Sequence, residues 1–302
     1  MSGSYPKIRV YAEDGALILR EGLSFSFYMK RPHREVVQSV IRSLEIFLQA
    51  VGHQALRRYI DDDGGSRSFD RTALSSIIQS LQERPSPIVQ LLDAPESQNQ
   101  FRFEYYGKSA NTLSGSSGAH AVCAVSFWLP TEYTAAQGAS RVRELGLELA
   151  SSLPFCSGHG GLSFNGELDL IGVPSEVAKR CFVHPGMDIP VSSRDTWKLG
   201  TRVRGPHWLT FLGQPVLGEL GGMAGLRARL HTSSTSVLEL DRERAVVTLG
   251  TEPEAGDTDK GQVLPAYREL ASVLAPWLYA GADRILDFSP EDSRRWHRRF
   301  VE

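Results

Sequence analysis

The sequence LPFCSGHGGLSFNG, residues 153–166, ends the N-terminal half of this 302-residue chain. The secondary structure expected for it determines the order of helices and strands predicted around it. Pro154 ends the amphipathic pattern before it, and Leu162 and Phe164 alternate with polar residues as in a β-strand. We therefore expect a helix before this segment, a tight turn at its glycines and a strand at its end.

Outward from this segment, the hydrophobic pattern predicts a series of strands and helices. Residues 23–29 and 101–107 alternate aromatic and polar side chains, and residues 121–130 are almost entirely apolar, as in a central strand. Apolar residues recur at helical spacing over 33–52 and 134–152. The resulting order, β-α-insert-β-β-α-β, is that of a ferredoxin-like antiparallel sheet with helices on one face.

The insert that interrupts this order carries polar and proline-rich segments. The run DDDGGSRS, residues 61–68, predicts a solvated loop, and Asp70 predicts the N-cap of a short helix. The stretch at residues 84–100 is rich in proline and polar residues, which predicts an irregular connection.

The C-terminal half repeats a similar order of elements more weakly. A strand is expected near residues 207–212, followed by a broken helix, a hairpin around residues 242–243 and a helix over 264–279. We therefore predict an α+β fold with a mainly antiparallel sheet. Its two related α+β halves, residues 1–166 and 167–302, are expected to share one core as a single unit.

The composition is that of a globular protein without a strong overall charge. Hydrophobic residues make up 41% and charged residues 23% of the chain, and the formal net charge is −2, so no global positive field favours nucleic acid. No apolar run is long enough to span a membrane, and the N-terminal residues lack the apolar core of a signal peptide. The odd, sparse set of cysteines (Cys123, Cys156 and Cys181) indicates a reducing cytoplasm rather than a disulfide framework.

The glycine-rich segment also contains residue types that are used in catalysis. It follows a helix, enters a strand and has no lysine, which is the reverse of a phosphate-binding loop. Cys156 and His159 allow a nucleophile with its base, but no motif names a residue that would orient the histidine. Cys181 and His184 repeat the C-x-x-H spacing of a zinc ligand pair. Because neither pair comes with the further residues it needs, we expect no bound metal, no cofactor and no catalytic residue.

Several landmarks together resemble one protein family. They are VSFWLPTEY (125–133), the glycine-rich segment, HWLTFLGQPVLGELGG (207–222), GDTDKGQVLPAYRELASVLAP (256–276) and RRWHRRF (294–300), and they resemble the TsiV-like type VI immunity family. The resemblance implies a bacterial immunity protein that binds and silences a cognate toxin, often a nuclease, delivered between competing cells. It carries over no catalytic residue.

A nuclease partner would make the acidic loops of this chain candidates for recognition. Its substrate groove must be positively charged to hold phosphates, so carboxylates on the inhibitor would speed association and oppose dissociation. The acidic residues are Asp61, Asp62 and Asp63 in one loop and Glu252, Glu254, Asp257 and Asp259 in another. We predict that at least one loop lies in the toxin interface. The alternative is that both are solvated linkers.

Two classes of function therefore remain. A pure binder needs complementary shape and charge but no assembled active site, which suits a sequence rich in core motifs and poor in catalytic ones. The alternative is a hydrolase with a site around Cys156 and His159. The sequence leaves the toxin, the binding face and the oligomeric state open.

Overall fold

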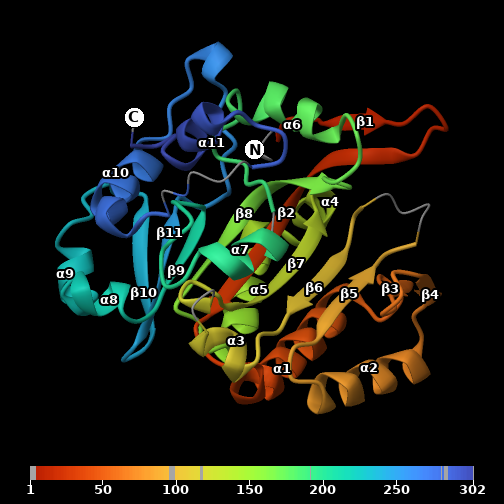
Figure 1. Ribbon diagram of the computed structural model, residues 1–302. Helices are drawn as coiled ribbons and strands as arrows, with labels where there is room; N and C mark the ends of the chain where they lie inside the picture. Colours follow the sequence, from red (N-terminus) through yellow and green to blue (C-terminus); the bar gives the residue numbers. More distant parts are fainter. Residues whose placement is uncertain are drawn as a thin grey trace.

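The computed structural model describes residues 5–94, 99–115, 118–190, 192–279, 281 and 285–301. Its strands form one sheet in the order β10-β11-β9-β8-β2-β7-β6-β5-β3-β4, with β1 paired to β2 (Figure 1). All pairs of these strands are antiparallel, which confirms the predicted α+β class. The strands are β1 (Arg9–Tyr11), β2 (Leu17–Met29), β3 (Arg58–Ile60), β4 (Ser66–Ser68), β5 (Ile88–Leu92), β6 (Arg102–Tyr106), β7 (Cys123–Pro130), β8 (Ser157–Gly166), β9 (Leu209–Leu212), β10 (Thr235–Asp241) and β11 (Arg244–Leu249).

Two long helices pack side by side on one face of the sheet. α1 (His33–Val51) and α5 (Ala139–Ser151) bury their apolar stripes in the main hydrophobic core, against aromatic side chains of β2 and β7. The helix predicted over 134–152 is divided, because Gly138 adopts a φ of 82° before α5. The other helices are α2 (Arg71–Glu83), α3 (Ala110–Ser114), α4 (Thr131–Gln137), α6 (Val173–Cys181), α7 (Ser192–Lys198), α8 (Val216–Glu219), α9 (Gly222–Arg227), α10 (Pro265–Leu274) and α11 (Pro290–His297), with 3-10 turns η3 (Thr258–Lys260) and η4 (Ala275–Trp277).

The glycine-rich segment forms a strand, so the predicted tight turn is wrong. β8 pairs with β2 along its whole length. Its glycines make room for aromatic rings of β2. A β-carbon at Gly160 would lie 2.2 Å from Cδ1 of Phe25, and one at Gly158 would lie 2.7 Å from Cδ1 of Phe27. Close packing against these rings, rather than a bend of the backbone, is the reason for glycine at these positions.

The insert extends the sheet instead of forming loops. β3 and β4 make a hairpin whose tip carries the three aspartates. β5 occupies the segment predicted as an irregular connection and pairs with both β3 and β6. The helix after Asp70 is confirmed, and the Asp70 side chain accepts a hydrogen bond from the Ala73 N–H at 2.8 Å. The insert predicted between α1 and β6 contains β3, β4, α2 and β5, and the ferredoxin-like order of the N-terminal half stays a prediction.

The opposite face of the sheet is polar at its centre and apolar at one end. The buried polar side chains of this centre, on β2, β7, β8 and β9, are Ser24, Ser26, Ser126, Ser157, His159, Ser163, Asn165 and Thr210. Residues 187–190 and 192–207 cover it through contacts such as the hydrogen bond from Ser157 Oγ to the Arg202 carbonyl. At the β10–β11 end, a second hydrophobic cluster packs α8, α9 and α10 against β11. One sheet thus runs through both predicted halves, and their division at residue 166 stays a prediction.

The C-terminal elements follow the predicted order. β9, the α8–α9 pair, the β10–β11 hairpin and α10 succeed one another, and the last predicted helix continues as the η4 turn after Leu274. Trp296 and Phe300 at the closing helix are buried. Across the described ranges, no helix combines the length and the apolar character needed to cross a bilayer.

Replacing Gly160 with alanine is expected to lower the free energy of unfolding by about 2 kcal/mol, a usual cost of overpacking a core. The matched control is Gly161→Ala in the same strand, where the added β-carbon meets Cβ of Trp208 at an ordinary 3.4 Å. Urea denaturation of both variants and the parent protein measures the difference. Equal stability of the two variants would contradict the packing role assigned to Gly160.

Candidate functional site

The first acidic loop is the tip of the β3–β4 hairpin, and two of its carboxylates are neutralised locally. Asp61 pairs with Arg67 at 2.7 Å, and Asp62 pairs with Arg84. Asp63 is exposed, and no ion pair within the described residues involves it. Of the three aspartates, Asp63 is therefore the one whose charge is not balanced by a partner.

The second acidic loop lies between β11 and α10. Asp257 accepts a hydrogen bond from the backbone of Lys260, which caps the η3 turn, and pairs with Lys260 Nζ at 2.6 Å. Glu252 is half-buried, whereas Glu254 and Asp259 are exposed and form no ion pair in the part of the chain that the structure describes. The two acidic loops follow strands near opposite ends of the sheet, so they offer separate surfaces.

Cys156 and His159 do not form a nucleophile with its base in this fold. The Cys156 Sγ lies 3.1 Å from the Tyr28 carbonyl oxygen, and burial raises the pKa of its thiol to about 11. The His159 ring instead contacts Asp188 and stacks on His207. Cys156 therefore keeps its proton at neutral pH, which disfavours thiolate chemistry at this site.

Cys181 and His184 also make separate contacts and do not form a ligand pair. Cys181 is buried in α6, and burial raises the pKa of its thiol to about 12. His184 Nδ1 lies 2.8 Å from the Gly256 carbonyl oxygen. Neither residue belongs to a group of three or more converging metal ligands within the described ranges.

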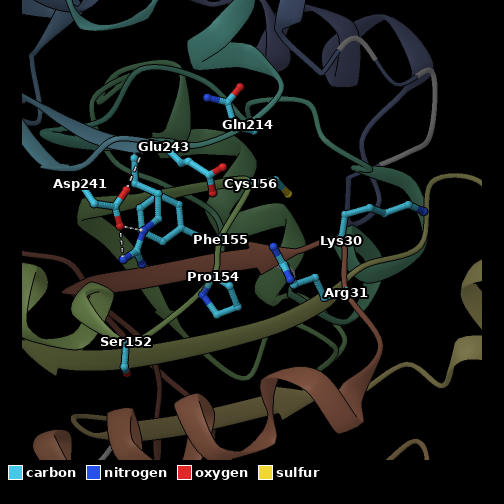
Figure 2. Close-up of a pocket in the computed structure, with 10 residues that line it drawn as sticks. Lys30, Arg31, Ser152, Pro154, Phe155, Cys156, Gln214, Asp241 and Glu243 are labelled. Carbon is cyan, nitrogen blue, oxygen red and sulfur yellow. Dashed lines mark hydrogen bonds and ion pairs between the residues drawn. The ribbon is translucent and has the colours of Figure 1, made fainter.

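A cavity of about 370 Å³ adjoins Cys156, and Lys30, Asp241 and Arg244 at its edge make structural contacts (Figure 2). Lys30 donates from Nζ to backbone carbonyls at 2.7 to 3.0 Å. Arg244 pairs with Asp241 at 2.6 Å and donates to carbonyls at the end of α5. These contacts tie the ends of β2 and β11 to neighbouring segments, and we assign the cavity no catalytic role.

A network of buried charges holds the segment between α6 and β9 on the polar face of the sheet. Arg204 donates from Nη2 to Asp188 Oδ1 at 3.0 Å and from Nη1 to Asp195. Tyr28 of β2 donates to Asp195 at 3.0 Å, and His159 of β8 donates from Nε2 to Asp188 at 3.1 Å. Each of these side chains belongs to a residue at most 4% exposed. The network therefore joins the covering segment to two central strands.

Burial and pairing fix the charges of this network. Burial alone would raise the pKa of Asp188, but Arg204 and the neighbouring histidines outweigh it and hold this pKa well below its usual value. Burial lowers the pKa of His159 to about 4, and His207 adds to this effect. At neutral pH the network therefore contains ionised Asp188 and Arg204 beside a neutral His159.

His159, Asp188 and His207 are the group in the described residues whose ligand atoms converge as metal ligands do, within 4.8 Å of one another. The residue types would suit a transition metal. Arg204, however, already supplies a positive charge at Asp188, and a divalent ion there would lie beside a fixed guanidinium. The expectation that the chain binds no metal stays a prediction, and this group is the place to test it.

A hollow of about 440 Å³ opens on the sheet face opposite α1, over β3, β5 and β6. Phe103 and Tyr105 of β6 point into the core with α1, so the alternate residues Arg102, Glu104 and Tyr106 point to this hollow. The loop after β8 and the start of α7 form its walls. Sequence reasoning gave no indication of this surface, because its residues come from separate strands.

The comparisons with known proteins agree with the resemblance seen in the sequence. The model of the TsiV family, described as "Type VI immunity for VRR-NUC", matches residues 39–300. The chain belongs to the TsiV family. It is thereby a member of a type VI immunity family, as its motifs indicated.

The fold of this TsiV-family chain is similar to that of a solved structure. The Pseudomonas aeruginosa T6SS protein PA0821 matches with a TM-score of 0.81, over 97% of this chain and 87% of that chain, at 19% sequence identity. This likeness shows a shared fold. No curated protein sequence matches the chain significantly.

Sequence analysis singled out His159, but as a base for Cys156 and not as a member of the buried network. Asp188, Asp195 and Arg204 lie in a stretch without a clear periodic pattern, and they meet His159 only through the tertiary fold. A second signal was available in His207, because it begins the HWLTFL motif of the TsiV resemblance.

Acidification is expected to destabilise this TsiV protein through His159. Its pKa is lower in the folded than in the unfolded chain, so its contribution to stability is complete above about pH 6.5 and is lost as the pH falls toward about 4. His159→Gln should therefore reduce the loss of unfolding free energy by up to about 1.4 kcal/mol per pH unit, the contribution of one proton. Urea denaturation between pH 7 and pH 4.5 measures the two slopes. Identical slopes would contradict this assignment.

Proposed function

We propose that this TsiV-family chain binds a VRR-NUC nuclease toxin, neutralises it and so protects a bacterium from type VI attack. The observation that carries the proposal is the family match over residues 39–300, with its description as immunity for VRR-NUC. The description of the structural neighbour as a T6SS protein agrees with the same setting. Because a nuclease toxin acts on nucleic acid inside the target cell, we propose the cytoplasm as the place of encounter.

The structure favours a binder over the alternative hydrolase. Neutralisation by binding needs a complementary surface rather than a reactive group. The Cys156 thiol is buried and held protonated, and the His159 ring is engaged by Asp188. The residues that a hydrolase would need are therefore committed to the interior of the fold.

A titration is expected to separate binding from catalysis. The purified chain, mixed with its cognate VRR-NUC nuclease, should abolish plasmid cleavage only as the molar ratio approaches one to one. A binder is consumed by its target, whereas a hydrolase would inactivate many toxin molecules per copy. Cys156→Ser should leave the titration unchanged, because the thiol takes no part in binding.

An unrelated nuclease with the same metal requirement is the control, and it should stay active at every ratio. Inhibition far below one to one would support the hydrolase, and so would its loss in a Cys156→Ser variant of unchanged thermal stability. Undiminished cleavage with the chain in excess would contradict the immunity role.

We further propose that at least one acidic loop contacts the toxin. The test changes only carboxylates without ion pairs, because the paired aspartates hold the turns. One variant carries Asp63→Asn, and the other carries Glu254→Gln together with Asp259→Asn. The variant at the interface should slow association about threefold or more at low ionic strength, and less at high ionic strength. Stopped-flow mixing measures these rates. Unchanged rates for both variants would contradict the proposal.

A further inference from the structure

The sheet face opposite α1 forms the floor of a groove at its β3–β5–β6 end. We use the name groove for the hollow of about 440 Å³ whose floor carries Arg58, Gln90, Arg102, Glu104 and Tyr106. Residues 187–190 and 192–207 cover the centre of this face, and the second hydrophobic cluster covers its other end. The groove is thus a part of the face where strand side chains reach an open surface.

Exposed apolar side chains gather around the groove. Leu170 and Ile171 continue the loop that forms one wall, and Ile171 is 102% exposed. Ile88 lies opposite Tyr106 in the β5–β6 register, and Trp197 projects from α7, which contacts β6. Of the seven large hydrophobic residues exposed in the described part of the chain, four are these. Such clustering on a soluble protein marks a contact surface.

Carboxylates outnumber cations among the charged residues that line the groove. Arg102 forms ion pairs with two of these carboxylates, Glu104 at 3.4 Å and Glu167 at 2.8 Å. Asp169 is exposed and forms no ion pair in the described residues, and Arg58 is the other lining cation. Burial raises the pKa of Glu104, so Glu167 and Asp169, which are more exposed, carry the negative charge that a positively charged partner would meet.

Within the part of the chain that the structure describes, the hairpin tip adds one unpaired carboxylate, Asp63, because Asp61 and Asp62 are balanced by Arg67 and Arg84. A neighbouring hollow of about 220 Å³ contains Asp61 and Asp62 and shares Ile60 and Gln90 with the groove. Asp63 follows directly at the hairpin tip. The first acidic loop therefore flanks the groove rather than forming a separate surface.

We infer that the groove is the docking surface for the toxin and that the toxin fills it with a basic loop that also carries aliphatic side chains. The inference rests on the proposed function. A lysine or arginine of this loop would lie among Glu104, Glu167 and Asp169, while its aliphatic neighbours cover Leu170 and Ile171. A protein that holds nucleic-acid phosphates carries such basic side chains, and interfaces concentrate their binding energy in a few anchors of this kind.

Two substitutions, one at a wall residue and one two residues further along the same loop, test the charge and the apolar contact separately. Asp169→Lys and Ile171→Ser alter exposed side chains, so both variants should fold. Each is expected to raise the Kd for the purified VRR-NUC nuclease about tenfold, and together about a hundredfold. Asp169→Lys should act mainly on the association rate.

The matched controls lie far from the groove. Glu45→Lys reverses an exposed charge on α1, on the other face of the sheet, and Leu238→Ser removes a 48% exposed side chain on the edge strand β10. Both should keep the Kd within about twofold of the parent protein, which is within the usual range for neutral surface positions. Thermal unfolding of all four variants shows that differences in binding do not come from loss of fold.

The outcomes distinguish this inference from the proposed function. If the parent protein binds the nuclease and the Asp169→Lys and Ile171→Ser variants bind it equally well, the groove is overturned and the proposed function stands. If the parent protein does not bind the nuclease at all, this result contradicts the proposed function and also the inference that the toxin occupies the groove. If Ile171→Ser abolishes self-association in size-exclusion chromatography but leaves nuclease binding unchanged, the groove belongs to a second copy of the chain, which also overturns the inference.

Discussion

The ion pairs of Arg204 hold the covering segment, residues 187–190 and 192–207, on the polar face of the sheet. The Arg204 guanidinium donates hydrogen bonds to both Asp188 and Asp195, among side chains with almost no exposure. Removing one partner of such a buried pair typically costs about 3–5 kcal/mol, because the other charge stays buried without compensation. The sheet beneath presents serine, threonine and histidine side chains, so hydrophobic burial alone does not hold a cover there. Attachment of that cover to β2 and β8 therefore depends on the ion network.

The same network determines where one wall of the groove, the start of α7, lies. Asp195 belongs to α7, two residues before Trp197, and Asp188 precedes the wall residue Pro190 by two. Fixing both carboxylates on Arg204 fixes α7 against β6 and β7. A wall that is ordered before the partner arrives loses less conformational entropy on binding. In this fold, stability and the shape of the open surface come from the same contacts.

Local patterns account for the part of the fold that the sequence predicted. The apolar stripes of α1 and α10, the alternation in β6 and the hairpin that contains β11 are visible within single segments, so these elements were predicted correctly. The glycines of β8 were misinterpreted because Phe25 and Phe27, which explain them, lie more than a hundred residues earlier. β3 and β4 were missed because each has three residues and little apolar pattern. The buried network escaped prediction for the same reason as the glycines, since its members meet only after folding.

The role of the acidic residues shows why charge recognition is hard to predict from sequence. In the sequence, all carboxylates of the two acidic loops look equivalent. In the fold, Asp61, Asp62 and Asp257 are balanced by cations a few ångströms away, so they contribute little field at a distance. Glu167 and Asp169 attracted no attention in the sequence, yet strand pairing brings them beside Glu104 of β6. The electrostatic field that a partner meets therefore depends on which carboxylates are exposed and which are paired with cations. A net charge of −2 does not reveal this distribution.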